Sequence, residues 1–154
     1  TPHHLDSALE QLSCSQHPRL EELLALSQQH PGAVHACTDV TGFGLLGHLN
    51  EMVAASEAIS VNLLVDQIPS FAGALECLAQ GITSTLAPAN RRALASLGTS
   101  VRVLREGQDI SHNLEPAIQD LLIDPQTCGP LLVSCSAAAA ATLQDLGWTA
   151  IARA

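Results

Sequence analysis

The chain of 154 residues has no lysine and no tyrosine, and it contains only two phenylalanines and one tryptophan. Six arginines stand against fifteen acidic residues, which gives a formal net charge of −9 at pH 7. Such a surface repels phosphate backbones and anionic lipid, and it lacks the aromatic side chains on which bases stack. We therefore expect neither nucleic-acid binding nor membrane-surface binding. The missing lysines also leave arginine as the only fixed cation for gripping phosphate.

Long apolar runs and a basic, apolar leader are missing as well. The longest stretch without charge, 125–144, is broken by polar residues, Gly and Pro, whereas a spanning helix needs roughly 20 continuous apolar residues. No signal-peptide pattern follows Thr1. Five cysteines, an odd number without a C-x-x-C pair, favour reduced thiols over a disulfide framework. These features predict a cytoplasmic protein.

Hydrophobic periodicity and turn signals predict helices alternating with short strands. Helices are expected at two segments within 5–30, from the Gly-rich turn to about 56, from a Ser70 cap to about 80, and at 88–97, 114–123 and 136–146. Strands are expected at 33–38, 59–65, 101–104, 131–135 and 148–152, with a polar loop at 105–113.

The predicted order of elements indicates an α+β fold with helices packed on a small mixed β-sheet. Two strand–helix–strand units on either side of a helical middle are typical of the split β-α-β, ferredoxin-like pattern. The length fits one domain over residues 1–154. The initial Thr and a strand that stops at the chain end predict a piece of a longer protein with a truncated final strand.

The segment from Asp39 to Leu49 reads Asp-Val-Thr-Gly-Phe-Gly-Leu-Leu-Gly-His-Leu and lies between a predicted strand and a predicted helix. Free backbone N–H groups and the helix dipole make such a turn an anion site. Gly42 and Gly44 let the backbone approach a bound group, and Thr41 offers a hydroxyl or a helix cap. Asp39 would repel a phosphate, a conflict that disappears if Asp39 binds Mg²⁺ shared with phosphate oxygens.

Other interpretations of this segment stay open. Gly42-x-Gly44-x-x-Gly47 matches the dinucleotide fingerprint, with Asp66 as the acidic residue beyond the next strand, although the fingerprint normally begins directly at the strand end. The glycines could also serve helix packing alone. A transition-metal site of His35, Cys37, Asp39 and His48 matches no zinc signature.

A second segment, Asp124-Pro-Gln-Thr-Cys-Gly-Pro130, lies between a predicted helix and a predicted strand. Asp-Pro followed by Gly-Pro makes a rigid turn, so its chemistry alone favours a structural loop. Cys128 would be the thiol that reaches solvent there, but a reactive thiol needs a neighbouring base that the sequence does not place.

The two segments together resemble the selenophosphate synthetases (selenide, water dikinases). Residues 35–49 are similar to the signature that opens the C-terminal domain of that family, and residues 124–130 resemble its Asp-Pro-Gln-Thr-Ser-Gly-Gly loop at the expected distance. The resemblance covers essentially the whole chain. It implies a domain of the aminoimidazole-ribonucleotide (AIR) synthase superfamily, C-terminal type.

The resemblance implies an enzyme that converts ATP, selenide and water to selenophosphate, AMP and phosphate with Mg²⁺. It implies that Asp39 binds Mg²⁺ and that Thr41, Gly42 and Gly44 line the nucleotide cleft. The family's catalytic Cys or selenocysteine and its Lys belong to an N-terminal domain that nothing here resembles, so no catalytic residue is assigned to this chain. Departures from the family pattern are Cys128 for Ser, Pro130 for Gly, and a middle loop that keeps only Asn90.

We accordingly expect the isolated chain to be inactive and to work with its own N-terminal domain, as a homodimer, on ATP and selenide. Two alternatives remain: a dinucleotide-binding (NAD) module, or a degenerate accessory domain fused to another enzyme and kept for dimerisation or stability. The changes at Cys128 and Pro130 in the second motif are the reason to retain the accessory-domain alternative.

Overall fold

The computed structural model describes residues 6, 8–10, 12–13, 19–56, 59–94, 100–127 and 129–154. Parts of the predicted helical segments within 5–30, and the predicted role of Cys128, lie outside these residues. The helices are α2 (Leu20–Gln29), α3 (Gly44–Ala54), α4 (Ala74–Ala79), α5 (Ala87–Leu94), α6 (Pro116–Leu122) and α7 (Ala137–Asp145), with a 3-10 turn η1 (Val65–Gln67). The strands are β1 (Val34–Asp39), β2 (Val61–Leu64), β3 (Val101–Arg105), β4 (Gln108–Asp109), β5 (Leu131–Cys135) and β6 (Ala152–Arg153).

The described strands form two sheets rather than one. β1 and β5 pair antiparallel, with Asp39 opposite Leu131. The other sheet has the order β4-β3-β2-β6, in which β2 and β3 are parallel and the outer pairs are antiparallel. The α+β class with a small mixed sheet is thus confirmed. The ferredoxin-like order stays a prediction, because the described pairings divide between two sheets.

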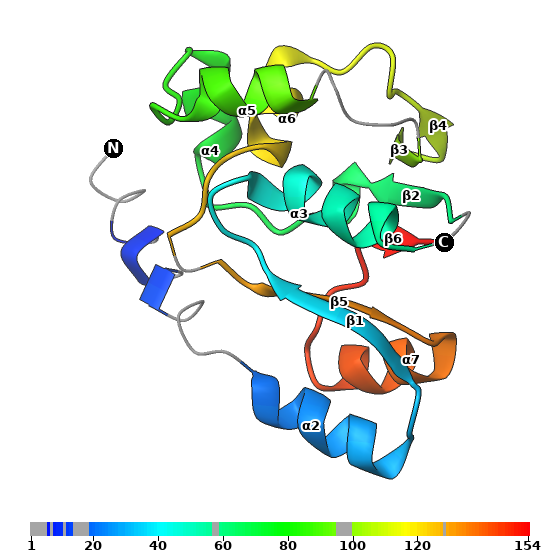
Figure 1. The fold of residues 1–154 in the computed structure, drawn as a ribbon. Helices are drawn as coiled ribbons and strands as arrows, with labels where there is room; N and C mark the ends of the chain where they lie inside the picture. Colours follow the sequence, from blue (N-terminus) through cyan, green and yellow to red (C-terminus); the bar gives the residue numbers. More distant parts are fainter. Residues whose placement is uncertain are drawn as a thin grey trace.

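Two hydrophobic cores correspond to the two sheets. In the larger core, α3 and α6 pack with the four-stranded sheet around the fully buried side chains of Leu63 and Leu122. In the smaller core, Leu23 and Leu26 of α2 meet Ala139 and Leu143 of α7. Figure 1 shows α2 and α7 below the β1–β5 ribbon, with α3 to α6 and the second sheet above it. The β1–β5 pair therefore lies between the two cores.

Three predicted elements were wrong in detail. Helix α4 does not begin at a Ser70 cap but at Ala74. The residue before it, Gly73, has a φ of +81°, and the Ala74 N–H donates to the Phe71 carbonyl in the turn that precedes the helix. The predicted polar loop contains β4, which closes a hairpin with β3. The last strand pairs at 152–153 rather than at 148–152, because Trp148 packs against the smaller core instead.

Candidate functional site

The first motif begins where β1 leaves its sheet and ends in the first turn of α3. Side chains along β1 alternate between half-buried and exposed, so that His35, Cys37 and Asp39 share the exposed side, as their spacing predicted. Val40 then enters the larger core with 4% exposure. The next residue, Thr41, is half-buried, and Gly42 is exposed. Asp39 therefore lies exposed on one side of the buried Val40, and Thr41 lies half-buried on the other.

The two motif glycines differ in their surroundings. Gly44 has a φ of +67°, and a Cβ there would lie 2.7 Å from the Cα of Ile123, so both the conformation and the packing require glycine. A Cβ on Gly42 would meet nothing within 4 Å. The described structure gives no packing reason for glycine at position 42, which agrees with a backbone kept open for something outside this chain.

The second motif lies directly against the first. The Gln126 N–H donates to the Thr41 carbonyl at 3.0 Å, and the Val40 N–H donates to the Pro130 carbonyl at 3.0 Å. A Cβ on Gly129 would collide with the Val40 carbonyl group, whose carbon lies 2.8 Å from that position. Pro130 thus keeps the acceptor that the contact uses, although it has no N–H. Sequence reasoning had not joined these two loops.

Asn90, on α5, links the middle of the chain to the first motif loop and to the residue before the second. Its side chain is 8% exposed, and Nδ2 donates to the Gly42 carbonyl at 2.9 Å and to the Ile123 carbonyl at 3.0 Å. Arg91 braces the same helix against α6 through two bonds of 2.6 and 2.5 Å to the buried Asp120 carboxylate. Asn90, the one residue of the middle loop that keeps the family pattern, is therefore an anchor of the motif loop.

The Thr41 hydroxyl does not cap α3, which has no side-chain cap. It lies 3.1 Å from Nε2 of His48, and Nδ1 of His48 lies 3.1 Å from Oε2 of Glu51. The Phe43 ring lies beside the imidazole with the ring centroids 5.8 Å apart. His48 had been considered only as a metal ligand, and its i, i+3 spacing to Glu51 on the helix is the signal that could have revealed this pairing.

Two acidic groups near the motifs, the Asp124 carboxyl and the Cys37 thiol, have shifted pKa values, and both pKa values are raised. Burial raises the pKa of the Asp124 carboxyl, an effect that its hydrogen bond from Gln126 partly offsets and that nearby Asp120 reinforces. Burial also raises the pKa of the Cys37 thiol, and the Asp39 charge adds to that shift. Cys37 is thus held as a neutral thiol, which argues against a thiolate ligand or nucleophile there.

The fit of Mg²⁺ depends on Asp39. Among the described residues, its carboxylate has no hydrogen-bond or ion-pair partner, and a carboxylate is the ligand that Mg²⁺ favours together with phosphate. No group of three His, Cys, Asp or Glu in the described part of the chain could hold a metal ion. The Asp39 carboxylate is thus free to bind a cation, but the described residues do not by themselves complete a cation site.

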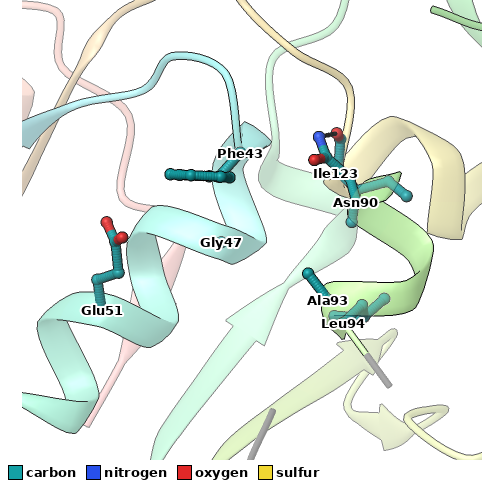
Figure 2. Close-up of a pocket in the computed structure, with 7 residues that line it drawn as sticks. All are labelled: Phe43, Gly47, Glu51, Asn90, Ala93, Leu94 and Ile123. Carbon is teal, nitrogen blue, oxygen red and sulfur yellow. Dashed lines mark hydrogen bonds between the residues drawn. The ribbon is translucent and has the colours of Figure 1, made fainter. Parts of the chain in front are cut away.

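The hollow beside Phe43 is small. It measures about 190 Å³ and lies between α3, α5 and the end of α6, with Gly47, Asn90, Leu94 and Ile123 among its walls (Figure 2). Ligand pockets generally run from roughly 300 to 1,000 Å³. This hollow is therefore smaller than a site that would enclose a nucleotide.

The dinucleotide interpretation fails on topology. The fingerprint requires the strands before and after the helix to be parallel neighbours in one sheet. Here β1 and β2 belong to different sheets. Asp66 is also engaged elsewhere, since its carboxylate accepts the Glu106 N–H at 2.8 Å in the β3–β4 turn. Gly42, Gly44, Gly47 and Asp66 therefore do not form a dinucleotide site.

Comparison with known proteins agrees with the resemblance. The family model of AIR synthase related protein, C-terminal domain, matches residues 10–147. Relatives named "Selenide, water dikinase" are 38% identical in Clostridioides difficile (strain 630), 41% in Burkholderia orbicola (strain MC0-3) and 43% in Dechloromonas aromatica (strain RCB). These alignments cover 66%, 75% and 67% of this chain.

The same alignments cover 26%, 28% and 26% of the relatives themselves, so the chain spans about a quarter of the proteins it matches. The greater part of each relative thus has no counterpart in this sequence. Within the described residues, no helix has the length and apolar character needed to cross a membrane.

Proposed function

The chain belongs to the family of AIR synthase related proteins, C-terminal domain, and from this premise we propose that it is the C-terminal domain of a selenophosphate synthetase. In that protein it would supply the Mg²⁺ and phosphate side of an active site completed by an N-terminal domain. The reaction would convert ATP, selenide and water to selenophosphate, AMP and phosphate. The proposal includes a homodimer in the cytoplasm.

The observation that carries the proposal is the Asp39 carboxylate, which has no partner among the described residues yet stands on a rigid support. Its neighbour Val40 is fixed by the larger core and by the Pro130 carbonyl. Rigid placement is what a metal ligand needs, because misplacement by about 1 Å weakens a site markedly.

The residues of this chain would act by position. Bound Mg²⁺ supplies neutralisation of charge on the phosphate oxygens. Asp39 would hold its share of the cation, and the backbone at Gly42 would face the nucleotide, since Gly42 is exposed and no described atom lies within 4 Å of a Cβ placed on it. Asn90 would keep that loop in place through the Gly42 carbonyl. Proton transfer and attack on phosphorus would depend on groups of the N-terminal domain.

The test is Asp39→Asn in this chain joined to its N-terminal domain. We expect selenide-dependent ATP turnover to fall by more than about 100-fold, because even the outer partners of metal ligands cost roughly 10–100-fold. The melting temperature should stay unchanged, since the carboxylate stabilises nothing in the described structure. Asp145→Asn, at the exposed end of α7, removes the same charge far from the motif and should leave turnover unchanged.

The isolated chain should show no selenide-dependent ATP turnover. Turnover by the isolated chain would show that the site is not shared. Unchanged turnover of the joined protein with Asp39→Asn would remove Asp39 from the site.

A further inference from the structure

Three polar side chains form a line from the motif loop into α3. Thr41 Oγ1 lies 3.1 Å from His48 Nε2, and His48 Nδ1 lies 3.1 Å from Glu51 Oε2. The His48 side chain is 10% exposed, whereas the Glu51 side chain is 63% exposed. Both ring nitrogens of a buried histidine are thus occupied inside the protein, one by the motif and one by a carboxylate from the next turn of the helix.

The carboxylate determines where the ring hydrogen lies. A carboxylate only accepts hydrogen bonds, so the hydrogen between Glu51 and the ring belongs to Nδ1. In the neutral imidazole, Nε2 then carries a lone pair and no hydrogen. The bond to Thr41 can form only if the hydroxyl donates its hydrogen to Nε2. The oxygen of Thr41 is left with acceptor capacity alone.

We propose that His48 is a positioning residue that sets the Thr41 hydroxyl as an acceptor, so that the motif loop offers an oxygen lone pair, two residues after Asp39, to a divalent cation or to its bound water. This inference rests on the proposed function. Asp39 is exposed and Thr41 is half-buried, with the buried Val40 between them in the chain. A phosphate oxygen would need a donor, and the Thr41 hydrogen is committed to the ring, so phosphate is left to the backbone N–H groups.

The surroundings hold the imidazole in one orientation. The Phe43 ring lies 5.8 Å from it between centroids, and Phe43 can lie there because Gly47 has no side chain: a Cβ on Gly47 would meet the Phe43 Cβ at 2.5 Å. Figure 2 shows Phe43 and Glu51 on the same side of α3. Glycine at position 47 thus leaves room for the Phe43 side chain that lies beside His48.

The first test needs no cofactor. Long-range ¹H–¹⁵N NMR spectra of the labelled 154-residue chain, assigned to His48 by loss of the signals in His48→Gln, should show hydrogen on Nδ1 and none on Nε2. Glu51→Gln should produce a mixture of tautomers, because an amide both donates and accepts. Glu76→Gln, an exposed glutamate on α4, should leave the tautomer unchanged. A ring with hydrogen on Nε2 in the unchanged chain would overturn the inference.

The second test measures the Mg²⁺ concentration that gives half-maximal turnover in the chain joined to its N-terminal domain. Thr41→Val and His48→Leu should each raise it about tenfold, which is the smaller effect of losing an outer partner of a metal site. Thr41→Ser and His48→Gln, which keep a hydroxyl and an acceptor, should recover most of the loss. Thr142→Val on α7 is the control, since the hydroxyl it removes only bonds the helix backbone.

The outcomes separate the two proposals. If the joined protein shows no selenide-dependent ATP turnover, the proposed function fails, and the NMR result still decides the role of His48. If turnover is present and Thr41→Val leaves the Mg²⁺ requirement unchanged, the inference fails and the proposed function stands. A loss of melting temperature with an unchanged Mg²⁺ requirement would make the histidine a structural tether and would also overturn the inference.

Discussion

The larger and the smaller core lie on opposite sides of the β1–β5 pair and are held by different means. Around the larger core, the motif loops are joined mostly by bonds to backbone groups: the Gln126 N–H to the Thr41 carbonyl, the Val40 N–H to the Pro130 carbonyl, and the Asn90 side-chain amide to two carbonyls, with the Arg91–Asp120 ion pair beside them. Around the smaller core, the Ser136 N–H donates to the Ala33 carbonyl, and a cluster of polar side chains joins α2 to the segment after α7. Trp148 Nε1 donates to Glu22 at 2.6 Å, and Arg19 lies 2.8 Å from the same carboxylate and 5.6 Å from the Trp148 ring.

The difference corresponds to the position of the candidate site. Backbone contacts have few rotatable bonds and tolerate little displacement, whereas contacts between exposed side chains can shift or open at small cost. The backbone beside Asp39 is held by contacts of the first kind. The motif loop enters the larger core through Val40, which explains why the metal ligand we propose is next to that residue.

The largest effect on the free energy of unfolding is expected from truncating one buried leucine in each core. Leu→Ala in a core costs roughly 2–5 kcal/mol, depending on how far the site can collapse. Leu63 lies fully buried in a central strand, so Leu63→Ala should lie at the upper end, about 4–5 kcal/mol. Leu143 lies on a surface helix that can settle, so Leu143→Ala should cost about 2–3 kcal/mol. Urea unfolding followed by circular dichroism measures both.

Trp148, the single tryptophan, packs on the smaller core and reports on it by fluorescence. We expect Leu143→Ala to move the fluorescence transition to lower urea than the dichroism transition, and Leu63→Ala to move the two together. Coincident transitions in both variants, with equal losses, would contradict a difference between the cores.

The next effect separates the two motif glycines. Gly44→Ala places a side chain at a φ of +67° and against the Ile123 backbone, and we expect a loss of about 3 kcal/mol. Gly42→Ala enters open space and should cost less than about 1 kcal/mol. Thermal unfolding of the two variants is the measurement. Equal destabilisation would mean that position 42 is also packed and would weaken the argument that its backbone is kept open for a ligand.

Sequence patterns predicted helices and strands well where the pattern involves residues close together in the chain. β5 was expected at 131–135 and is found there, and β1 is shifted by one residue at each end. The strand–turn–helix around Asp39 follows from alternation, glycines and helical periodicity, all within about fifteen residues. The placement of Asp39 on the exposed side of β1 with His35 and Cys37 followed from the period of two.

Contacts between distant segments could not be predicted in the same way. The collision that requires glycine at position 129 involves the Val40 carbonyl, and Asn90 bonds to carbonyls 48 and 33 positions away. Every residue has the same backbone carbonyl, so a hydrogen bond to a carbonyl leaves no recognisable pattern of side chains in the sequence. The dinucleotide pattern was misleading for the same reason: its spacing is local, but its meaning depends on which strands are neighbours.

The smallest effects concern pH, and they should have opposite signs in the two regions. The Trp148 hydrogen bond, and then Arg19, hold the pKa of Glu22 below its ordinary value of 4.5, so this contact stabilises the fold above that pH and is lost as the pH falls through the lowered pKa. Burial raises the pKa of Asp124 above its ordinary value of 3.8, so its contribution is full below that pH and is lost as the pH rises through the raised pKa.

Melting temperatures between about pH 3 and pH 7 should therefore change in opposite directions in two matched variants. Glu22→Gln should melt lower than the unchanged chain at neutral pH, because it gives up a favoured carboxylate, and the difference should vanish in acid. Asp124→Asn should melt slightly higher at neutral pH, because it no longer buries a charge, and its advantage should also vanish in acid. The Glu22–Arg19 ion pair is partly exposed, so added salt should reduce the share of the Glu22 effect that comes from this pair. A lower melting temperature for Asp124→Asn at neutral pH would instead show that the motif loop uses this charge, and the electrostatic contrast between the two regions would be lost.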